Sequence, residues 1–518
     1  MPPPHDTLTE PLLAVVADDV STPLTLPAVL ARLGRGAPTE FAALRAHQRA
    51  PWHAFLVQLA AIACARYGDE RLDVDEAAWC ARLLALTGGA HEPWCLVVDD
   101  LTKPALLQPP VPEKKLDAFK RTSAQPDALD VLITAKNHDL KSARMDHARP
   151  EHWLYALVTL QTTEGFLGKG NYGVARMNGG FASRPQVGVA RGPGFADRFA
   201  RDVRTWLEAR DGVIERFGYA PGGIALLWCE PWDGSSSIAL DRLDPFFIEV
   251  CRRVRLTVDG GRIVARGVST EAARVEAKQL LGVTGDIWIP VKKEDAGKAL
   301  TVSAKGFDYV LLAQLLFPED YDPAAAQQLR PEDGDAPVFT ARVLARGQGE
   351  TNGLHERTLE IPAKRRGYLA DPTQRQRLGA RAKHRVAQVG EVKKRALRPA
   401  LATLLQGGAE KAKLDDPRVD PLMARFEGRV SERFFPSLWD DADLDGEASD
   451  ARWLHLLVHE LAAPVLDEAK RSAPLASERR YRAEAAADRV FWGSARKNFS
   501  AAFPKASVIT PAQEDPSP

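Results

Sequence analysis

The stretch ARWLHLLVHELAAPVL, residues 451–466, decides the architecture of the C-terminal part of this 518-residue chain. Its apolar residues recur at spacings of three and four, which places them on one face of a helix. These residues are Leu454, Leu457, Val458, Leu461 and Val465. The helix extends over about 447–471, and three more helical stretches lie at about 374–406, 420–435 and 476–500. Four amphipathic helices with short polar connections predict a four-helix bundle.

The residues before 365 have a different character, because helical and strand patterns alternate there. Residues 51–68 predict a helix with proline in its first turn and glycine at its end. Segments such as FFIEVCRRVRLTV (246–258) and GRIVARG (261–267) have the length and apolar content of strands. The predicted fold class is therefore α+β. Its parts are a large mixed N-terminal globular domain over 1–365, a C-terminal four-helix bundle over 370–502 and a disordered tail over 503–518.

Composition excludes several classes of protein. The formal net charge is zero, so a nucleic-acid partner cannot be argued from overall charge and any basic surface must be local. The five cysteines form no C-x-x-C pair, which fits reduced thiols and disfavours a cysteine zinc site. The first residues lack the features of a signal peptide, and no uncharged apolar run is long enough to span a membrane. We expect a cytoplasmic protein without membrane association.

The segment GKGNYGVARMNGGFASRP, residues 168–185, is rich in glycine and carries few core-forming residues. It lacks the Walker phosphate-loop pattern, and it follows a helical segment rather than a strand, which disfavours a dinucleotide-binding loop. Two interpretations stay open. The Asn-Gly pair at 178–179 is a strong hairpin-turn signal. Alternatively, glycines let backbone N–H groups approach a polyanion while Lys169, Arg176 and Arg184 supply positive charge.

Histidine and aspartate side chains cluster in the segment 135–153. His138, Asp139, Asp146 and His147 are ligand types of a metal-dependent nuclease or phosphohydrolase. Their local spacing does not match the separate helices that such metal sites use. The alternative is a solvated loop or one that contacts nucleic acid.

The stretch RGQGETNGLHERTLEIP, residues 346–362, is a second unusual segment. Its His-Glu pair at 355–356 is a poor acid–base pair, because neighbours in a strand point to opposite faces. The small polar residues before this pair predict a turn that presents Gln348, Thr351 and Asn352 outward. Such tips can enter a DNA groove and touch base edges, with little sequence stringency in the minor groove.

Two features have simple structural interpretations. Residues 361–400 contain twelve Lys or Arg against two acidic residues, which suits a solvated helix face or, alternatively, a face that contacts phosphates. His455 and His459 have the i, i+4 spacing that can hold zinc, but Leu456 stands where metalloproteases carry glutamate. We interpret these histidines as helix-surface or interface residues. The chain offers no coherent catalytic constellation.

These segments, in their order along the chain, resemble the large subunit (CasA) family of the type I-E CRISPR Cascade, an RNA-guided surveillance complex of antiviral defence. The resemblance covers nearly the whole chain, ends in a four-helix bundle and rests on six stretches. They are EFAALRAHQRAPWHAFLVQLAAIA (40–63), KPALLQPPVP (103–112), LDVLITAKNHDLKSARM (129–145), GKGNYGVARMNGGFASRP (168–185), LDPFFIEVCRRVRL (243–256) and GQGETNGLHER (347–357).

The resemblance implies a non-enzymatic subunit that meets the protospacer-adjacent motif (PAM) of duplex DNA from the minor-groove side and helps to part the strands. An R-loop can then form with the guide RNA. By position, the glycine loop would be Gly168, Lys169, Gly170, Asn171 and Tyr172. The wedge turn would be Gln348, Gly349, Glu350, Thr351, Asn352 and Gly353, with Thr351 or Asn352 at the tip, where some members carry glutamine. Lysines that contact the motif would be Lys292 and Lys293.

The resemblance also implies partners. Lys136, Asn137, His138 and Lys141 would lie in the loop that docks against the subunit holding the 5′ end of the guide RNA. The bundle would contact the small subunits and displaced DNA, other subunits would form the backbone, and a separate helicase-nuclease would be recruited. No metal or cofactor is expected, because WCEPWDGSSSIAL (228–240) replaces the cysteine cluster of some members.

Two alternatives to this DNA-recognition subunit stay open at this point. One is the metal-dependent nuclease or phosphohydrolase built on the histidine–aspartate cluster. The other is a structural scaffold whose loops contact only protein.

Overall fold

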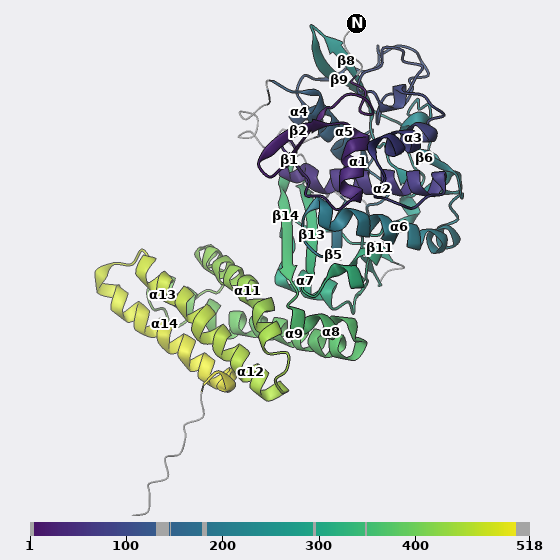
Figure 1. Ribbon diagram of the computed structural model, residues 1–518. Coiled ribbons are helices and arrows are strands. Elements are labelled where there is room, and N and C mark those ends of the chain that lie inside the picture. Colours follow the sequence, from purple (N-terminus) through teal and green to yellow (C-terminus); the bar gives the residue numbers. More distant parts are fainter. Residues whose placement is uncertain are drawn as a thin grey trace, which may run out of the picture. The chain divides into compact units, whose positions relative to one another are not determined.

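A computed structural model of the chain describes residues 5–130, 145, 147–178, 184–293, 297–347 and 350–503. It is an α+β protein, as predicted, and it divides into two compact units (Figure 1). The first unit comprises Met1–Phe307 and Pro318–Arg366, and the second comprises Asp308–Phe317 and Gly367–Pro518. The upstream residues Asp308–Phe317 therefore group with the C-terminal helices, which the predicted boundaries did not include.

The core of the first unit surrounds helix α2 (Arg49–Tyr67). Every residue from Pro51 to Cys64 is buried, and a helix that is apolar on all sides belongs inside a domain. It ends at Gly68 in the left-handed conformation (φ 73°), which confirms the predicted helix. Other helices of this unit are α1 (Leu26–Gly34), α3 (Glu76–Leu86), α4 (Pro126–Leu129), α5 (Pro150–Thr163) and α6 (Phe195–Phe217).

The strands of the first unit form several small sheets. Their spatial orders are β2-β1-β3, β4-β9-β8, β14-β13-β5, β11-β10-β12 and β6-β7. The strands are β1 (Leu13–Ala17), β2 (Val20–Leu24), β3 (Glu40–Phe41), β4 (Arg121–Ser123), β5 (Gln186–Ala190), β6 (Ile224–Leu226), β7 (Leu243–Ile248), β8 (Arg253–Asp259), β9 (Arg262–Val268), β10 (Val291–Lys292), β11 (Lys298–Ala299), β12 (Tyr321–Asp322), β13 (Val338–Gly347) and β14 (Glu350–Glu360).

The longest strands, β13 and β14, form an antiparallel hairpin, and β5 pairs with the other edge of β13 (Figure 1). The hairpin register runs from Val338 opposite Glu360 to Gly347 opposite Glu350. The register shifts between Ala345 and Arg346, so the hairpin contains a β-bulge close to its end.

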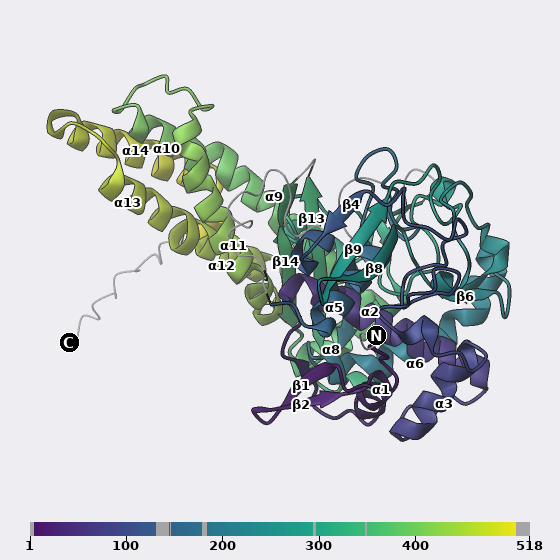
Figure 2. The same ribbon diagram turned by 90° about the horizontal axis from the view of Figure 1, so that it is seen from above.

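The second unit is helical and contains the four predicted helical stretches. Its helices are α7 (Tyr309–Leu316), α9 (Pro372–Val392), α10 (Arg398–Leu405), α11 (Asp420–Asp440), α12 (Gly446–His455), α13 (Ala463–Ser472) and α14 (Ser477–Asn498), while α8 (Ala363–Ala370) spans the boundary. Helices α10, α13 and α14 lie side by side (Figure 2). None of the helices in the described ranges is long and apolar enough to cross a membrane.

Two of the four stretches contain a π-helical turn, Lys393–Leu397 between α9 and α10 and Leu456–Ala462 between α12 and α13. Each π turn ends two residues before a proline, Pro399 or Pro464. Proline cannot donate to the carbonyl four residues back, and a local π turn lets the helix continue past it.

Candidate functional site

Arg346, on β13, joins three of the segments that the sequence singled out. Its Nη2 donates to the Asp130 carbonyl at 3.0 Å, and its Nη1 donates to Thr351 Oγ1 at 2.6 Å. The guanidinium also forms an ion pair with Glu164. Asp130 precedes the predicted docking loop, Glu164 lies between α5 and the glycine-rich segment, and Thr351 belongs to the predicted wedge turn.

This junction is buried. Arg346 is 6% exposed and Glu164 is 0% exposed. Because a buried charge is tolerated only when it is paired and hydrogen-bonded, the junction holds the bases of the three segments in one fixed arrangement.

The docking loop has a second buried anchor on its N-terminal side. The Asp130 carboxylate accepts hydrogen bonds from His47 Nε2 at 2.6 Å and Gln48 Nε2 at 2.9 Å. Asp127 accepts a hydrogen bond from the Met145 backbone N–H at 3.1 Å, which ties the far end of the loop to the same place.

The loop's own functional candidates lie outside the described residues. These are Lys136, Asn137, His138 and Lys141 of the docking prediction and His138, Asp139 and Asp146 of the metal prediction. His147, the remaining metal candidate, is exposed. Within the described ranges no three His, Cys, Asp or Glu side chains gather as a metal site would require.

The glycine loop is a tight turn. The Asn171 N–H donates to the Gly168 carbonyl at 2.9 Å, and Gly170 occupies the third turn position with φ 82°, as a type II turn requires. A Cβ on Gly170 would lie 2.7 Å from Ser269 Cβ, and the Gly170 carbonyl accepts from the Thr270 N–H at 3.1 Å. Glycine is therefore required here by both the backbone conformation and the close approach of residues 269–270.

The side chains of this loop differ in what they contact. Lys169 is exposed. Asn171 Oδ1 accepts a hydrogen bond from Arg121 Nη1 at 2.6 Å, and Tyr172 Oη donates to the Glu271 carbonyl at 3.0 Å. Arg121, on β4, is a residue that the sequence reasoning missed, because β4 is three residues long and lies 50 residues away in the chain.

Arg176 and Arg184 do not supply charge to a polyanion, and that prediction is wrong. They are 1% and 3% exposed. Arg176 pairs with Glu249 at 3.0 Å, and Arg184 Nε donates to Asp286 at 2.6 Å. Burial raises the pKa of Glu249, while the two arginines act in the opposite direction.

These buried ion pairs fix the backbone on both sides of residues 179–183, which lie outside the described ranges. Gly179, half of the predicted Asn-Gly turn, is among those residues, so the hairpin interpretation stays a prediction. The described residues 171–178 contain no strand.

The predicted wedge turn lies at the end of the β13–β14 hairpin, but its tip differs from the prediction. Because Gly347 pairs with Glu350, the connection between the strands consists of residues 348 and 349 alone. Thr351 pairs with Arg346, so it lies inside β14. Asn352 is the extra residue of the bulge and is exposed.

Placing Thr351 or Asn352 at the tip is therefore wrong. Gln348 and Gly349 lie outside the described residues, and the side chain of Glu350 is not described. Gly353 has φ 135°, which is a conformation that favours glycine.

The predicted DNA-contacting lysines belong to another sheet of the first unit. Lys292 is half-buried on β10, between Lys298 of β11 and Tyr321 of β12. Lys293 is exposed, and its N–H donates to the Asp320 carbonyl at 2.9 Å. Gly282 lies between this sheet and the glycine-rich segment, because a Cβ on it would contact Ala299 of β11 and lie 2.5 Å from the carbonyl carbon of Met177.

The two candidate histidines of the second unit pack in an aromatic cluster, in agreement with the interpretation as interface residues. The rings of His455 and His459 stack at 4.6 Å, and the His459 ring lies 5.3 Å from that of Trp492. Burial and the neighbouring His455 lower the pKa of His459.

Several arginines of the basic segment 361–400 form ion pairs and hydrogen bonds within the second unit. Arg385 is buried and pairs with Asp441 at 2.5 Å, and Arg381 Nη2 donates to the Leu444 carbonyl at 2.8 Å. Arg398 pairs with Asp420 at 2.7 Å. The local excess of positive charge is therefore smaller at the surface than the sequence count implies.

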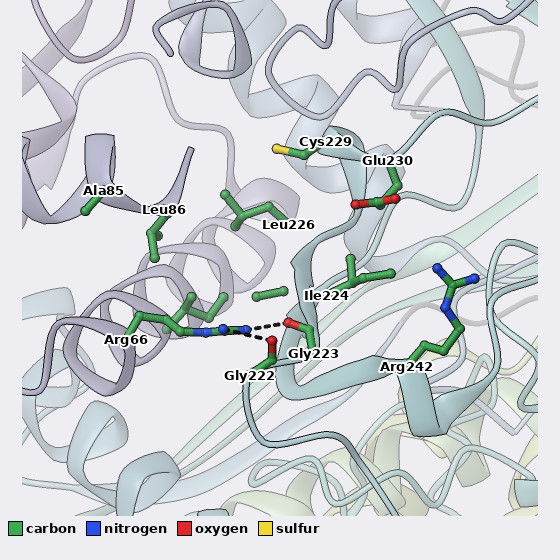
Figure 3. A pocket seen from close by; sticks show the side chains of 12 residues that line it. Arg66, Ala85, Leu86, Gly222, Gly223, Ile224, Leu226, Cys229, Glu230 and Arg242 are labelled. Atoms are coloured by element: carbon green, nitrogen blue, oxygen red, sulfur yellow. Dashed lines mark hydrogen bonds between the residues drawn. The ribbon is translucent and has the colours of Figure 1, made fainter. Parts of the chain in front are cut away.

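Two polar regions of the first unit lie apart from the predicted loops. One is a cavity of about 650 Å³ lined by Arg66, Gly222, Gly223, Glu230 and Arg242, among others (Figure 3). Arg66 Nη1 donates to the Gly222 carbonyl at 2.9 Å, so its guanidinium holds the backbone of the cavity wall. None of the predicted site residues lines this cavity.

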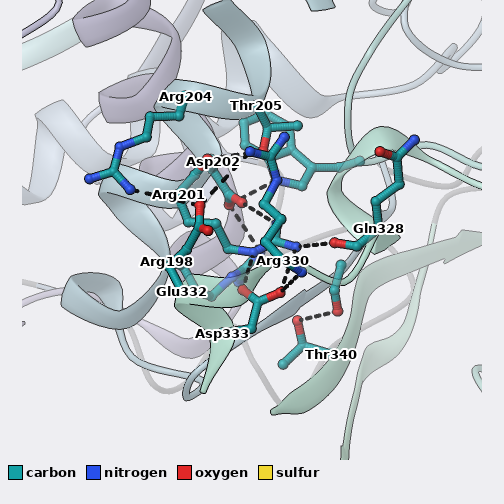
Figure 4. A network of polar contacts seen from close by, with 12 residues as sticks. Arg198, Arg201, Asp202, Arg204, Thr205, Gln328, Arg330, Glu332, Asp333 and Thr340 are labelled. Atoms are coloured by element: carbon teal, nitrogen blue, oxygen red, sulfur yellow. Dashed lines mark hydrogen bonds and ion pairs between the residues drawn. The ribbon is translucent and has the colours of Figure 1, made fainter. Parts of the chain in front are cut away.

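The other region is a buried ionic network that ties α6 to the segment preceding β13 (Figure 4). Arg201 Nε donates to Asp333 at 2.5 Å, and Asp202 accepts hydrogen bonds from His53 and Trp288 at 2.8 and 3.0 Å. Burial and the nearby Arg198 lower the pKa of His53 to about 4, which keeps its imidazole neutral. The network fixes the start of the strand that carries Arg346.

Comparison with solved structures finds chains with the same fold, although comparison with sequences finds no match. No family model matches the chain, and no curated protein matches its sequence. Among solved structures, CasA of Thermus thermophilus has a TM-score of 0.63 at 13% identity, covering 95% of this chain and 99% of that chain. The CRISPR-associated protein Cse1 of Acidimicrobium ferrooxidans has a TM-score of 0.61 at 14% identity, covering 95% and 98%.

Thermobifida fusca Cse1 has a TM-score of 0.57 at 13% identity, covering 96% of this chain and 99% of that chain. The resemblance stated from the sequence is thereby confirmed at the level of the fold. This chain has the fold of CasA and Cse1 chains over almost its whole length.

Proposed function

We propose that this chain is the non-catalytic large subunit of a type I-E CRISPR Cascade complex, of the CasA family. In this role it recognises the PAM in target duplex DNA, helps to open the strands for R-loop formation and recruits the helicase-nuclease. The fold shared with CasA and Cse1 chains supports the proposal. The observation that carries it is the buried junction at Arg346, which joins the bases of three segments with the composition of DNA-contacting loops.

The glycine loop is the proposed reader of the PAM. Its turn exposes Lys169 and brings Asn171 close to the surface, so one side chain can contact a phosphate and the other a base edge. Lys292 and Lys293 add positive charge for the same duplex. Guide RNA pairing supplies the long sequence specificity, so the protein needs to read only a short element.

The β13–β14 hairpin is the proposed wedge. It is ten and eleven residues long in its two strands, and only two residues connect them. A paired hairpin held close to its tip by Arg346 is stiffer than a free loop, which suits an element that must separate stacked base pairs. Opening costs little overall, because the RNA–DNA hybrid is about as stable as the DNA duplex it replaces.

The proposed partners are the other Cascade subunits. The segment containing Lys136, Asn137, His138 and Lys141 docks against the subunit that holds the 5′ end of the guide RNA. The four-helix bundle contacts the small subunits and displaced DNA. The complex acts in the cytoplasm.

The test measures duplex binding by the complex reconstituted from this chain and its partner subunits. Asn171→Ala, and separately Lys292→Glu with Lys293→Glu, should weaken binding to PAM-bearing duplex about tenfold, in the range of a lost base or phosphate contact. Binding to a pre-opened target should change less. Arg191→Glu is the matched control, because Arg191 is exposed and follows the end of β5 that pairs with Val338, far from the hairpin tip.

Equal losses on duplex and pre-opened target would contradict the proposal. Stoichiometric bound metal, together with DNA cleavage that His138→Ala abolishes, would instead support the metal-dependent nuclease.

A further inference from the structure

We propose that Arg121 is a positioning residue that fixes the carboxamide of Asn171, so that the glycine loop presents hydrogen-bond donors to the duplex. The inference rests on the proposed function. It adds the role of Arg121 and the statement that the loop presents donors rather than acceptors. It predicts which chemical group in a DNA groove the loop rejects.

The geometry around Arg121 carries the argument. Its Nη1 donates to Asn171 Oδ1 at 2.6 Å, and its Nη2 donates to Ser269 Oγ. A guanidinium has no acceptor, so the Asn171 atom that faces it must be the oxygen. The amide Nδ2 therefore points elsewhere, and within the described residues it has no hydrogen-bond partner.

The backbone beneath these groups is also fixed. The turn is closed by the hydrogen bond from Asn171 to Gly168, and Gly170 packs against Ser269. Ser269 is the second partner of Arg121. Arg121 and the turn therefore both contact the short segment after β9. The Asn171 side chain is held by Arg121, and its backbone is held by the turn.

Within the described residues, the hydrogen-bond partners of Arg121 are neutral, so its positive charge is not neutralised by them. The side chain is exposed, and these neutral partners are Asn171 and Ser269. Lys120 and Lys169 are exposed as well. Arg121 can therefore hold Asn171 with its hydrogen bonds while its positive charge still favours approach of the DNA backbone.

A donor-presenting loop has a definite preference in the minor groove. A·T pairs offer only acceptors there, whereas G·C pairs add the donor amino group on guanine N2. An outward Nδ2 can donate to adenine N3 or thymine O2 but meets a second donor at guanine. The loop should therefore reject a minor-groove amino group at the base pair that Asn171 contacts.

The experiment compares PAM-bearing duplexes that contain adenine or 2,6-diaminopurine, a base that adds only the minor-groove amino group. The readout is the ratio of the two dissociation constants for each reconstituted complex. The unaltered complex should prefer adenine about tenfold, as for a single mismatched contact. Arg121→Ala and Arg121→Gln should reduce that preference to about twofold or less, because the carboxamide is then free to turn over.

Comparing complexes cancels the extra duplex stability that diaminopurine brings, since all complexes bind the same two duplexes. Lys120→Ala is the matched control for charge, and it should change the salt dependence of binding but leave the ratio unaltered. Arg121→Lys should retain most of the preference, because lysine also only donates.

The outcomes separate the inference from the proposed function. PAM-dependent binding with the same adenine preference in Arg121→Ala and Arg121→Gln would overturn the role of Arg121 alone. Absence of PAM-dependent duplex binding in the unaltered complex would instead overturn the proposed function. Because Arg121 is exposed, neither variant removes a core contact.

Discussion

At the scale of single residues, arginines of the glycine-rich segment are buried, although the sequence pattern indicated surface charge. Arg176 and Arg184 are buried because they pair with Glu249 and Asp286. These partners lie 73 and 102 residues further along the chain. Arginine is rarely buried unless it is paired, and a single sequence does not reveal pairs at such separations. Lys169 is exposed as predicted, because a short turn leaves its side chain nothing to pack against.

Replacement of Arg346 tests the junction. Arg346→Met leaves the Glu164 carboxylate buried without its cation, so we expect the free energy of unfolding to fall by about 3–5 kcal/mol. Urea denaturation followed by circular dichroism measures this loss. Adding Glu164→Met should restore much of the stability, because replacing both charges by apolar side chains removes the buried unpaired group.

The control for this experiment is Arg191→Ala. The Arg191 side chain is 66% exposed, and its ion pair with Asp197 at 3.8 Å should contribute less than about 0.5 kcal/mol. A loss in Arg346→Met no larger than that of the control would contradict the junction.

His53 makes the fold sensitive to acid. Its pKa is about 4 in the folded protein and 6.5 ordinarily, so the unfolded chain takes up a proton at a higher pH than the folded chain does. The contribution of neutral His53 is complete above pH 6.5 and is lost as pH falls toward 4, by roughly 3 kcal/mol in all. In His53→Gln the slope of unfolding free energy against pH should be smaller across that window. An unchanged slope would show that His53 is not held neutral.

At the scale of elements, helices were easier to predict than strands. The pattern of α12 and α13 is local, and Gly68 stops α2 by its own conformational freedom. The segment 285–293 (GDIWIPVKK), by contrast, has the apolar content of a strand, but within it only Val291–Lys292 forms one. Pairing needs a distant partner that periodicity does not supply. The position of the hairpin tip depends on a different feature, a single bulge residue that shifts the register.

Glycine substitutions test the hairpin. Gly353→Ala places a side chain at φ 135°, so we expect a loss of about 1–3 kcal/mol and faster amide hydrogen exchange in β13 and β14. Gly212→Ala is the matched control, because Gly212 lies inside α6 with open space around its Cβ position. That control should gain about 0.4–1 kcal/mol. Equal effects of the two substitutions would contradict the strained conformation at Gly353.

At the scale of the whole molecule, the resemblance drawn from the order of the unusual segments is confirmed at the level of the fold. The junction between them was not predictable, since it depends on Arg346 meeting residues 182 and 216 positions away. We propose that the glycine loop and the hairpin act together on one duplex.

The most direct measurement is photo-cross-linking of the reconstituted complex to PAM-bearing duplex, with a photoreactive residue at exposed position 169 or, separately, at exposed position 352. Both positions should form adducts with base pairs of the PAM or its immediate neighbours. Adducts with partner proteins alone, or with DNA positions more than one helical turn apart, would contradict this proposal.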